Sequence, residues 1–326
     1  SATGQAGQDI MFLGEDMQVK SVTVNGENPG TPVEVLATGG HTLTVLDAAA
    51  ITTESSAPAT TFNTPVAFSA STATVAVNST NPLTLGGAVS GTNVTKTGGG
   101  TLILSGTNTY TGTTTISAGT LQLGSGGTTG SLNATGSIVN DAALAFHRSD
   151  TVTQGTDFAA VISGTGEVRQ TGTGTTILTG ANTYTGTTTI SAGTLQLGDG
   201  GTTGSLNTAS ALVNNATLAF NRSNTLTQGT DFNAVISGTG EVRQIGTGTT
   251  VLNGANTYSG ATVVSAGTLR VTANTALGTT AAGTTVASGG TLELAGDVTV
   301  TGEDLTLNGD GAGGNGALRS SSGNNT

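Results

Sequence analysis

Apolar and polar residues alternate over short stretches of this sequence, and these stretches recur along the chain. The second and fourth residues of each four-residue stretch are mostly apolar, as in Leu121 and Leu123 or Leu144 and Phe146. Alternation with a period of two is typical of a β-strand with one buried face. The stretches begin at positions 42, 65, 93, 120, 143, 167, 194, 217, 241, 268, 291 and 317. Their mean spacing is about 25 residues, a period typical of solenoid repeats.

The fourth position of these strands divides into two groups. Phe68, Phe146 and Phe220 occupy it in three strands, and we expect all three rings to point into the core. Every third strand carries a polar residue there instead: Lys96, Gln170, Gln244 and Ser320. We expect these strands to be shorter, with the polar residue in the following turn.

The strands belong to a longer repeat, whose copies are nearly identical. Residues Thr109–Gly124 and Thr183–Gly198 share the sequence TYTGTTTISAGTLQLG, and ISGTGEVRQ occurs at Ile162–Gln170 and again at Ile236–Gln244. Such self-similarity, here with a 74-residue period, indicates a solenoid in which each turn buries its apolar row by stacking on its neighbours. We therefore predict an all-β fold, a parallel β-helix solenoid with about 25 residues per rung and a three-rung repeat. Further strands are expected near positions 113–117, 137–140, 151–153, 160–163 and 175–178.

Other folds fit this pattern less well. No apolar stripe of helical period persists, and a β-propeller would need about 40–50 residues per blade. A left-handed β-helix would show a hexapeptide rhythm, and a disordered glycine-rich linker would lack the alternation. Four of the five prolines precede residue 70, so we expect residues 1–85 to form an irregular first section of the solenoid. Residues 86–326 would continue it regularly, as part of a longer chain.

Composition narrows the chemistry that the chain can perform. Its 326 residues include 69 Thr and 53 Gly but no Cys and only two His, so thiolate metal sites and disulfides are excluded. A net charge of −11 with eight Lys and Arg argues against a nucleic-acid partner. No apolar run is long enough for a membrane-spanning helix.

The charged residues do not form a recognisable catalytic pattern. Asp157, Glu167 and Arg169 recur as Asp231, Glu241 and Arg243, and duplication along a solenoid favours solvated charge pairs over a catalytic site. The adjacent acids Glu15 and Asp16, and likewise Glu303 and Asp304, would point to opposite faces of a strand. His147 and Arg148, matched by Asn221 and Arg222, are expected in an exposed turn, and His41 is expected to be structural.

Two further motifs favour structure over binding. Residues 309–316 (GDGAGGNG) faintly resemble a calcium-binding β-roll repeat, but with a single Asp in a single copy we expect a flexible glycine turn. Tyr110, Tyr184 and Tyr258 are too widely spaced for a sugar-stacking platform, and we expect them at corners beside the core. We accordingly nominate no catalytic, cofactor-binding or metal-binding residue and expect no cofactor.

The segment Gly100–Gly124, GTLILSGTNTYTGTTTISAGTLQLG, resembles the autotransporter-associated β-strand repeat of bacterial type V passenger domains, and similar segments occur at 175–198 and 249–271. The resemblance implies a right-handed winding, secretion across the bacterial envelope and a C-terminal β-barrel translocator that is not part of this chain. It describes the scaffold and leaves the ligand open.

Together these observations predict a non-enzymatic extracellular rod, a stalk or adhesin passenger at a bacterial cell surface. Expected partners are surface glycans or proteins of a host or of the environment, with the membrane reached only through the absent translocator. The alternative is a filament or matrix subunit that self-associates end to end or laterally, because open rung ends are unpaired strand edges. A carbohydrate-active enzyme would need converging carboxylates, for which the sequence gives no sign.

Overall fold

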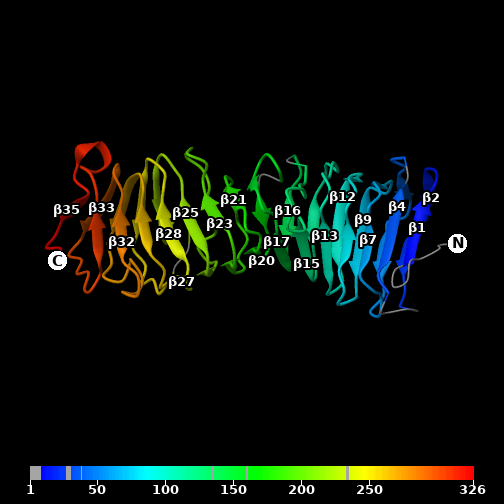
Figure 1. Cartoon of the computed structure of the whole chain (residues 1–326), viewed down its shortest axis with the longest axis horizontal. Coiled ribbons are helices and arrows are strands. Elements are labelled where there is room, and N and C mark those ends of the chain that lie inside the picture. Colours follow the sequence, from blue (N-terminus) through cyan, green and yellow to red (C-terminus); the bar gives the residue numbers. More distant parts are fainter. Residues whose placement is uncertain (1–8, 27–30, 38, 134, 159–160, 233–234) are drawn as a thin grey trace. The chain divides into compact units, whose positions relative to one another are not determined.

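The computed structural model describes residues 9–26, 31–37, 39–133, 135–158, 161–232 and 235–326. By its internal contacts the chain divides into two compact units, residues 1–167 and 168–326. Each unit consists of short parallel strands that wind repeatedly around one core. Figure 1 shows this winding, with colours that follow the sequence from blue to red. The all-β parallel solenoid predicted from the sequence is therefore confirmed. No helix among the described residues is long and apolar enough to cross a membrane.

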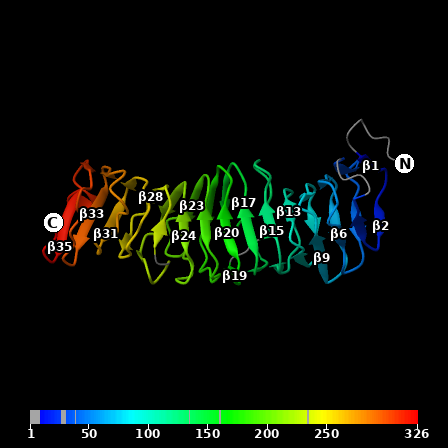
Figure 2. The ribbon, with the colours of Figure 1, turned by 90° about the horizontal axis from the view of Figure 1, so that it is seen from below.

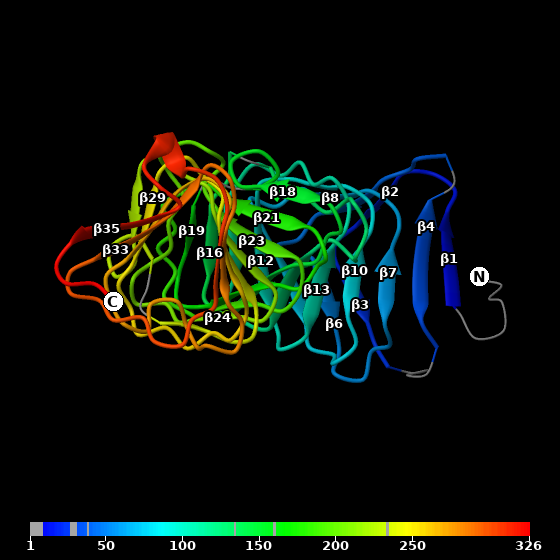
Figure 3. The same cartoon turned by 60° about the vertical axis from the view of Figure 1, so that its left-hand side comes forward.

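The first unit stacks its strands into three sheets, one per face of the solenoid. Figure 3 shows the first members of one sheet, β4, β7 and β10, in succession. The sheets contain, in stacking order, β1 (Asp9–Leu13), β4 (Val33–Ala37), β7 (Thr60–Phe62), β10 (Leu83–Leu85), β13 (Thr101–Leu104), β15 (Thr120–Leu123) and β17 (Ala143–Phe146); β2 (Met17–Val19), β5 (Leu43–Val45), β8 (Val66–Phe68) and β11 (Val89–Ser90); and β3 (Val22–Val24), β6 (Ile51–Thr53), β9 (Thr72–Val77), β12 (Asn93–Thr97), β14 (Thr114–Ile116), β16 (Ile138–Asn140) and β19 (Ile162–Ser163). A further strand, β18, spans Thr151–Thr153.

The second unit repeats this three-sheet arrangement, and Figure 2 shows several of its strands side by side. Its sheets contain β20 (Glu167–Gln170), β22 (Thr188–Ile190), β24 (Leu212–Asn214) and β27 (Ile236–Ser237); β21 (Thr175–Leu178), β23 (Thr194–Leu197), β25 (Thr217–Phe220), β28 (Glu241–Gln244), β30 (Thr262–Val264), β32 (Thr284–Val286) and β34 (Leu305–Leu307); and β26 (Thr225–Thr227), β29 (Thr249–Leu252), β31 (Gly267–Val271), β33 (Gly290–Ala295) and β35 (Leu318–Ser322). A short 3₁₀ turn, η1, spans Ala312–Gly314.

Alternate residues of each strand form continuous buried rows. Leu102, Leu121 and Leu144 are register partners on β13, β15 and β17, and all three side chains are at most 1% exposed. Phe146 and Phe220 are equally buried and Phe68 nearly so, which confirms their predicted place in the core. Each row is covered from both sides by the same kind of residue, so burial of one rung depends on its neighbours.

The 74-residue repeat is confirmed, and the register refines its geometry. In the second unit Leu195 pairs with Leu218, Leu218 with Val242 and Val242 with Thr262, so three successive rungs separate Leu195 from Thr262. The repeat equivalent of Leu195 is Leu269, which lies beyond Thr262 and in a different sheet. Each repeat thus advances by three rungs and one additional face.

This advance corrects one expectation about stacking. The strands that begin at Glu241 and at Thr268 do not stack on each other, because β28 pairs with β30 while β31 pairs with β29. The step from Glu241 to Thr268 therefore combines one rung with a change of face. Rungs also differ in length: the rung from Leu83 to Leu102 is short, and the rung from Val22 to Ile51 is long.

The recurring Ser-Ala-Gly corner shows why the repeat needs glycine there. Gly119, Gly193 and Gly267 all have positive φ, of 68°, 61° and 60°. A Cβ on each would collide with the carbonyl oxygen of Gly100, Gly174 and Gly248, respectively, on the preceding rung. Only glycine combines this backbone conformation with so close an approach.

The irregular first section that we expected at residues 1–85 stays a prediction.

Candidate functional site

The repeated acidic and arginine side chains contact residues that are close to them in the sequence. Arg243 Nε lies 2.9 Å from Glu241 Oε1, on the outward face of β28. Asp231 Oδ2 accepts a hydrogen bond from Thr227 N at 2.7 Å, and Asp157 Oδ2 accepts the equivalent bond from Thr153 N at 2.8 Å. The two aspartates therefore shape the turn after β26 and β18. Among the described residues, no three His, Asp or Glu side chains gather closely enough to hold a metal ion.

Arg148 is not the exposed turn residue that the sequence suggested. It is only 7% exposed, and its guanidinium donates to Thr128 O at 2.6 Å and to both carboxylate oxygens of Asp150, at 2.8 and 2.6 Å. The hydrogen bond from Arg148 holds the pKa of Asp150 below its usual range. Arg222, 8% exposed, makes the matching contacts to Asn224 and Gly204. Each arginine therefore holds the glycine-rich loop of the preceding rung in place by donating hydrogen bonds to its backbone carbonyls.

Removing the guanidinium of Arg148 should allow the loop of residues 124–130 to open more often. Arg148→Met keeps the length of the side chain but removes the bonds to Thr128 O and Gly130 O. We expect amide hydrogen exchange in this loop to become at least about tenfold faster, because even one charge-assisted bond is worth about 1.5–3 kcal/mol. Hydrogen-exchange mass spectrometry measures the rate. Arg243→Met, which removes a half-exposed guanidinium, should leave it unchanged.

The three tyrosines form buried corner contacts, as predicted. Tyr110, Tyr184 and Tyr258 are 0–2% exposed, and their hydroxyls lie 2.7–2.8 Å from the hydroxyls of Thr114, Thr188 and Thr262, respectively. Burial raises the pKa of each phenol, so all three stay neutral. Rings enclosed in this way offer no face on which a sugar could stack.

The polar residues at the fourth strand position do not lie in turns. Lys96 and Gln170 are within strands β12 and β20, with inward side chains that are 0% and 2% exposed, and Gln244 on β28 is 1% exposed. Ser320 also lies within its strand, β35. Our prediction that these strands are shorter and end before the polar residue is therefore wrong. The reason is that the inward side chains of Lys96, Gln170 and Gln244 donate to backbone carbonyls at the adjoining corner.

Lysine and glutamine form different sets of hydrogen bonds at this corner. Lys96 Nζ donates to Thr97 O, Gly98 O and Ala118 O at 2.8, 2.7 and 3.0 Å. Gln170 Nε2 donates to Gly172 O at 2.8 Å, and its Oε1 accepts a bond from Thr176 Oγ1 at 2.6 Å. Burial lowers the pKa of Lys96 to about 8.

Lys96→Gln should remove a pH dependence of stability. Lys96 has a folded pKa of about 8 against 10.5 when solvated, so between these values the unfolded chain binds more protons. The free energy of unfolding of the wild type, measured relative to that of Lys96→Gln, should therefore rise from pH 8 to 10.5. Urea unfolding of both proteins at several pH values measures it. A constant difference would contradict the prediction, and the converse variant Gln170→Lys should acquire the slope.

The remaining sequence candidates also make structural contacts. His41 Nδ1 lies 3.5 Å from Asp16 Oδ1, and the same oxygen accepts a bond from Thr42 N at 2.9 Å. Glu303 Oε1 accepts a bond from Thr284 Oγ1 at 2.6 Å. Desolvation raises the pKa of Glu303, with repulsion from Asp304 contributing.

Residues 309–316 form a hydrogen-bonded turn around η1. Gly316 N donates to Asp310 O at 2.7 Å, and Ala312 N donates to Thr291 Oγ1 at 2.9 Å. Gly309, Gly311 and Gly313 have positive φ. Asp310 thus contributes its backbone carbonyl to closing the turn, while its side chain is exposed.

One charged cluster was missed by the sequence argument. Glu293, only 3% exposed as a side chain, lies between Arg270 and Arg319, with contacts of 2.7 and 3.0 Å. Desolvation disfavours its charge, but bonds from Ser321 and Arg270 and both guanidinium charges outweigh this and lower its pKa. The three residues are register partners on β31, β33 and β35. Opposite charges at one outward strand position were the available signal.

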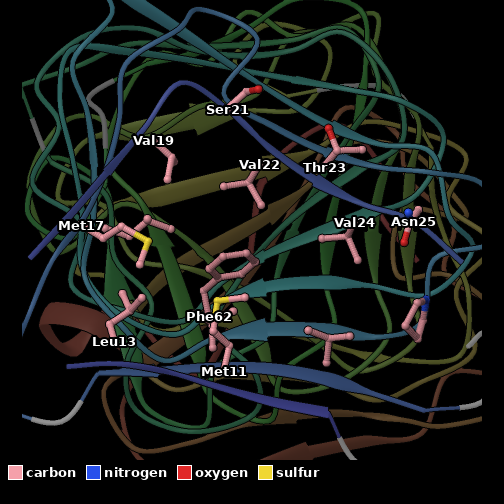
Figure 4. A pocket seen from close by; sticks show the side chains of 14 residues that line it. Met11, Leu13, Met17, Val19, Ser21, Val22, Thr23, Val24, Asn25 and Phe62 are labelled. Atoms are coloured by element: carbon pink, nitrogen blue, oxygen red, sulfur yellow. The ribbon is translucent and has the colours of Figure 1, made fainter. Parts of the chain in front are cut away.

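A hollow in the first unit lies at its first rung (Figure 4). Its volume is about 720 Å³, and its lining is mainly apolar. Side chains of Met11, Met17, Val22 and Phe62 point into it from different strands. These residues belong to the inward rows of β1, β2, β3 and β7, so the hollow is lined by core-facing positions, and none of its lining residues is titratable.

Comparison with known proteins identifies the repeat. Residues 94–123, 168–197 and 242–271 match the passenger-associated-transport-repeat family. The matched segments are evenly spaced, and each begins one solenoid repeat after the one before it. The resemblance to autotransporter passenger repeats is therefore confirmed.

A curated relative shares part of this sequence. The chain is 52% identical over 67 residues to the adhesin BmaC autotransporter of Brucella suis biovar 1 (strain 1330). The match covers 21% of the chain and 2% of that adhesin, so it concerns a short segment and not the whole protein. No solved structure matches the chain significantly.

Proposed function

We propose that this chain, an autotransporter passenger repeat protein, is displayed on a bacterial surface as a non-enzymatic stalk with an adhesive role. The main support is the coincidence of the three passenger repeats with the solenoid register. Each repeat supplies three rungs whose cores are closed by their neighbours, so repeats lengthen the scaffold without adding a separate active site.

The chemistry-bearing side chains support this proposal. Arg148 and Arg222 fasten loops, Lys96 and Gln170 satisfy carbonyls, and the tyrosines close corners. A glycosidase would need two carboxyl groups about 5–10 Å apart beside an open cleft. The apolar hollow at the first rung has no carboxylate in its lining. A scaffold accounts for these residues more economically than an enzyme does.

Surface display tests the proposal directly. The chain would be fused between a secretion signal and an unrelated autotransporter translocator, with the translocator alone as the control. We expect protease added to intact cells to remove the chain, and the displaying cells to bind immobilised fibronectin, collagen or mucin more than control cells. A chain that stays inaccessible to protease would overturn display, and display without any gain in binding would overturn the adhesive role.

A further inference from the structure

Asparagine-linked glycosylation needs the sequence Asn-x-Ser/Thr, in which the middle residue is not proline, and an asparagine that a transferase can reach. The chain contains this sequence at Asn78, Asn93, Asn133, Asn215 and Asn221. A threonine-rich chain acquires such matches by composition, so the sequence alone selects no site. Burial and hydrogen bonding in the structure distinguish these asparagines from one another.

The Asn93 side chain is already used to hold neighbouring rungs together. It lies on β12, where its Nδ2 donates to Ser71 O at 2.8 Å and its Oδ1 accepts a bond from Thr113 N, also at 2.8 Å. Thr95, the hydroxyl residue of this sequence, lies within the same strand, which pairs with β9 and β14. A transferase could reach Asn93 only if these strands separated.

The sequences at the other positions are also constrained. Asn215 Oδ1 accepts a bond from Thr239 N at 3.2 Å. In the sequence that begins at Asn221, the hydroxyl of Ser223 donates to a carbonyl of the neighbouring loop at 3.1 Å. The sequence at 133–135 contains a residue outside the described part of the chain.

Asn78-Ser79-Thr80 differs from these sequences because its reactive groups face solvent. It lies at the corner between β9 and β10, and the side chains of Asn78 and Thr80 are both exposed. Neither side chain forms a hydrogen bond with another described residue. The Oδ1 atom of Asn78 lies beside Gly98, where a Cβ would meet it at 2.6 Å.

Ser79, the middle residue, fixes the backbone of this corner. It is 1% exposed, and its Oγ donates to Ala57 O at 2.6 Å and accepts a bond from Asn81 N at 3.0 Å. Asn78 N donates to Thr53 O at 3.1 Å. The corner therefore presents its carboxamide and its second hydroxyl on a fixed backbone, which lowers the entropy lost when a transferase binds.

We propose that Asn78 is an acceptor for asparagine-linked glycosylation, with a nucleoside-diphosphate hexose as the sugar donor. Nδ2 of Asn78 attacks the anomeric carbon of the hexose, and this C–N bond forms as the bond from that carbon to the diphosphate oxygen breaks. The nucleoside diphosphate leaves with the bonding electrons, and one amide proton passes to a base of the transferase. The sugar covers the corner with a bulky, hydrated group.

A purified bacterial asparagine glycosyltransferase with UDP-glucose tests the site on the folded, full-length chain. Peptide mapping by mass spectrometry locates each added glucose. We expect glucose on Asn78 and none on Asn93. Synthetic peptides of residues 74–84 and 89–99 should both be modified, because in neither peptide is the asparagine held by neighbouring strands.

Substitutions at Thr80 separate recognition of the sequence from general access. Thr80→Val removes the hydroxyl and should slow modification of Asn78 at least about a hundredfold, because an enzyme that binds a hydroxyl rejects the analogue without it. Thr80→Ser keeps the hydroxyl and should be modified at a rate close to that of the wild type. Asn78→Gln should gain no glucose at this corner. Circular dichroism should show that all three variants fold like the wild type, because both side chains are exposed.

Four results would overturn the proposal. An unmodified 74–84 peptide would show that this sequence is not an acceptor, and a modified peptide with an unmodified folded chain would show that the corner is inaccessible. Equal rates at Asn78 and Asn93 in the folded chain would show that the structure does not select between them. An unchanged rate in Thr80→Val would show that the hydroxyl is not recognised. All four results are independent of surface display, which is tested separately.

Discussion

Removal of residues 188–261, one complete repeat, should leave a folded solenoid. The deletion joins Thr187 to Thr262 and brings β30 onto β20 in place of β22. In the intact chain Val168 pairs with Thr188, and its repeat equivalent Val242 pairs with Thr262, so the new pair reproduces an existing register. The hydroxyl of Tyr184, which contacts Thr188, would meet Thr262.

The next strands also find matched partners after this deletion. β21 currently pairs with β23 from Thr175 to Thr194, and β29 pairs with β31 from Thr249 to Thr268. In the shortened chain β31 would therefore stack on β21. We expect cooperative urea unfolding with a dependence on urea reduced by roughly a quarter, the fraction of the chain removed, because this slope scales with the surface exposed.

A much smaller deletion out of register should be far more damaging. Removing only residues 188–199 takes away β22 and β23 and brings loop residues next to β20. The buried rows of β20 and β21, the partners of the deleted strands, would then be uncovered on one side, and the backbone groups on that side would be unpaired. We expect aggregation or a loss of cooperative unfolding, seen by circular dichroism and size-exclusion chromatography. Equal stability of the two deletions would contradict the repeat register.

Leu121→Asp should abolish folding of the first unit under ordinary conditions. Leu121 is 1% exposed on β15 and lies between Leu102 and Leu144 in one buried row. An aspartate there would leave a cavity and an unpaired charge, which together cost more than about 4–5 kcal/mol. Typical domains are stable by about 5–15 kcal/mol, so most of the available stability would be lost. Thermal unfolding followed by circular dichroism would measure the effect.

Gln122→Lys is the matched control on the same strand. Gln122 faces outward, and its Nε2 donates to Gly124 O at 2.8 Å, a bond that a lysine Nζ can also make. The free energy of unfolding should change by less than about 0.5 kcal/mol. A loss as large as that of Leu121→Asp would show that the assignment of inward and outward positions is wrong.

Much of the fold follows from local pattern, and the failures share one cause. The strands expected at 113–117, 137–140 and 175–178 are present as β14, β16 and β21. Arg148, Lys96 and Gln170 were misplaced because polarity alone suggested exposure. The burial of Arg148 and Lys96 depends on carbonyl groups such as Thr128 O and Ala118 O, which are distant in sequence but only one rung away in space.

The sequence by itself determined the parallel β-solenoid, the 74-residue repeat and the inward rows of Leu, Val and Phe, because period-two alternation and near-identical repeats are local properties. Only the tertiary structure decided that each repeat advances by one extra face, since that depends on how many residues each corner consumes. It also decided which polar residues are buried, because a rung's carbonyl groups find their hydrogen-bond donors across the stack.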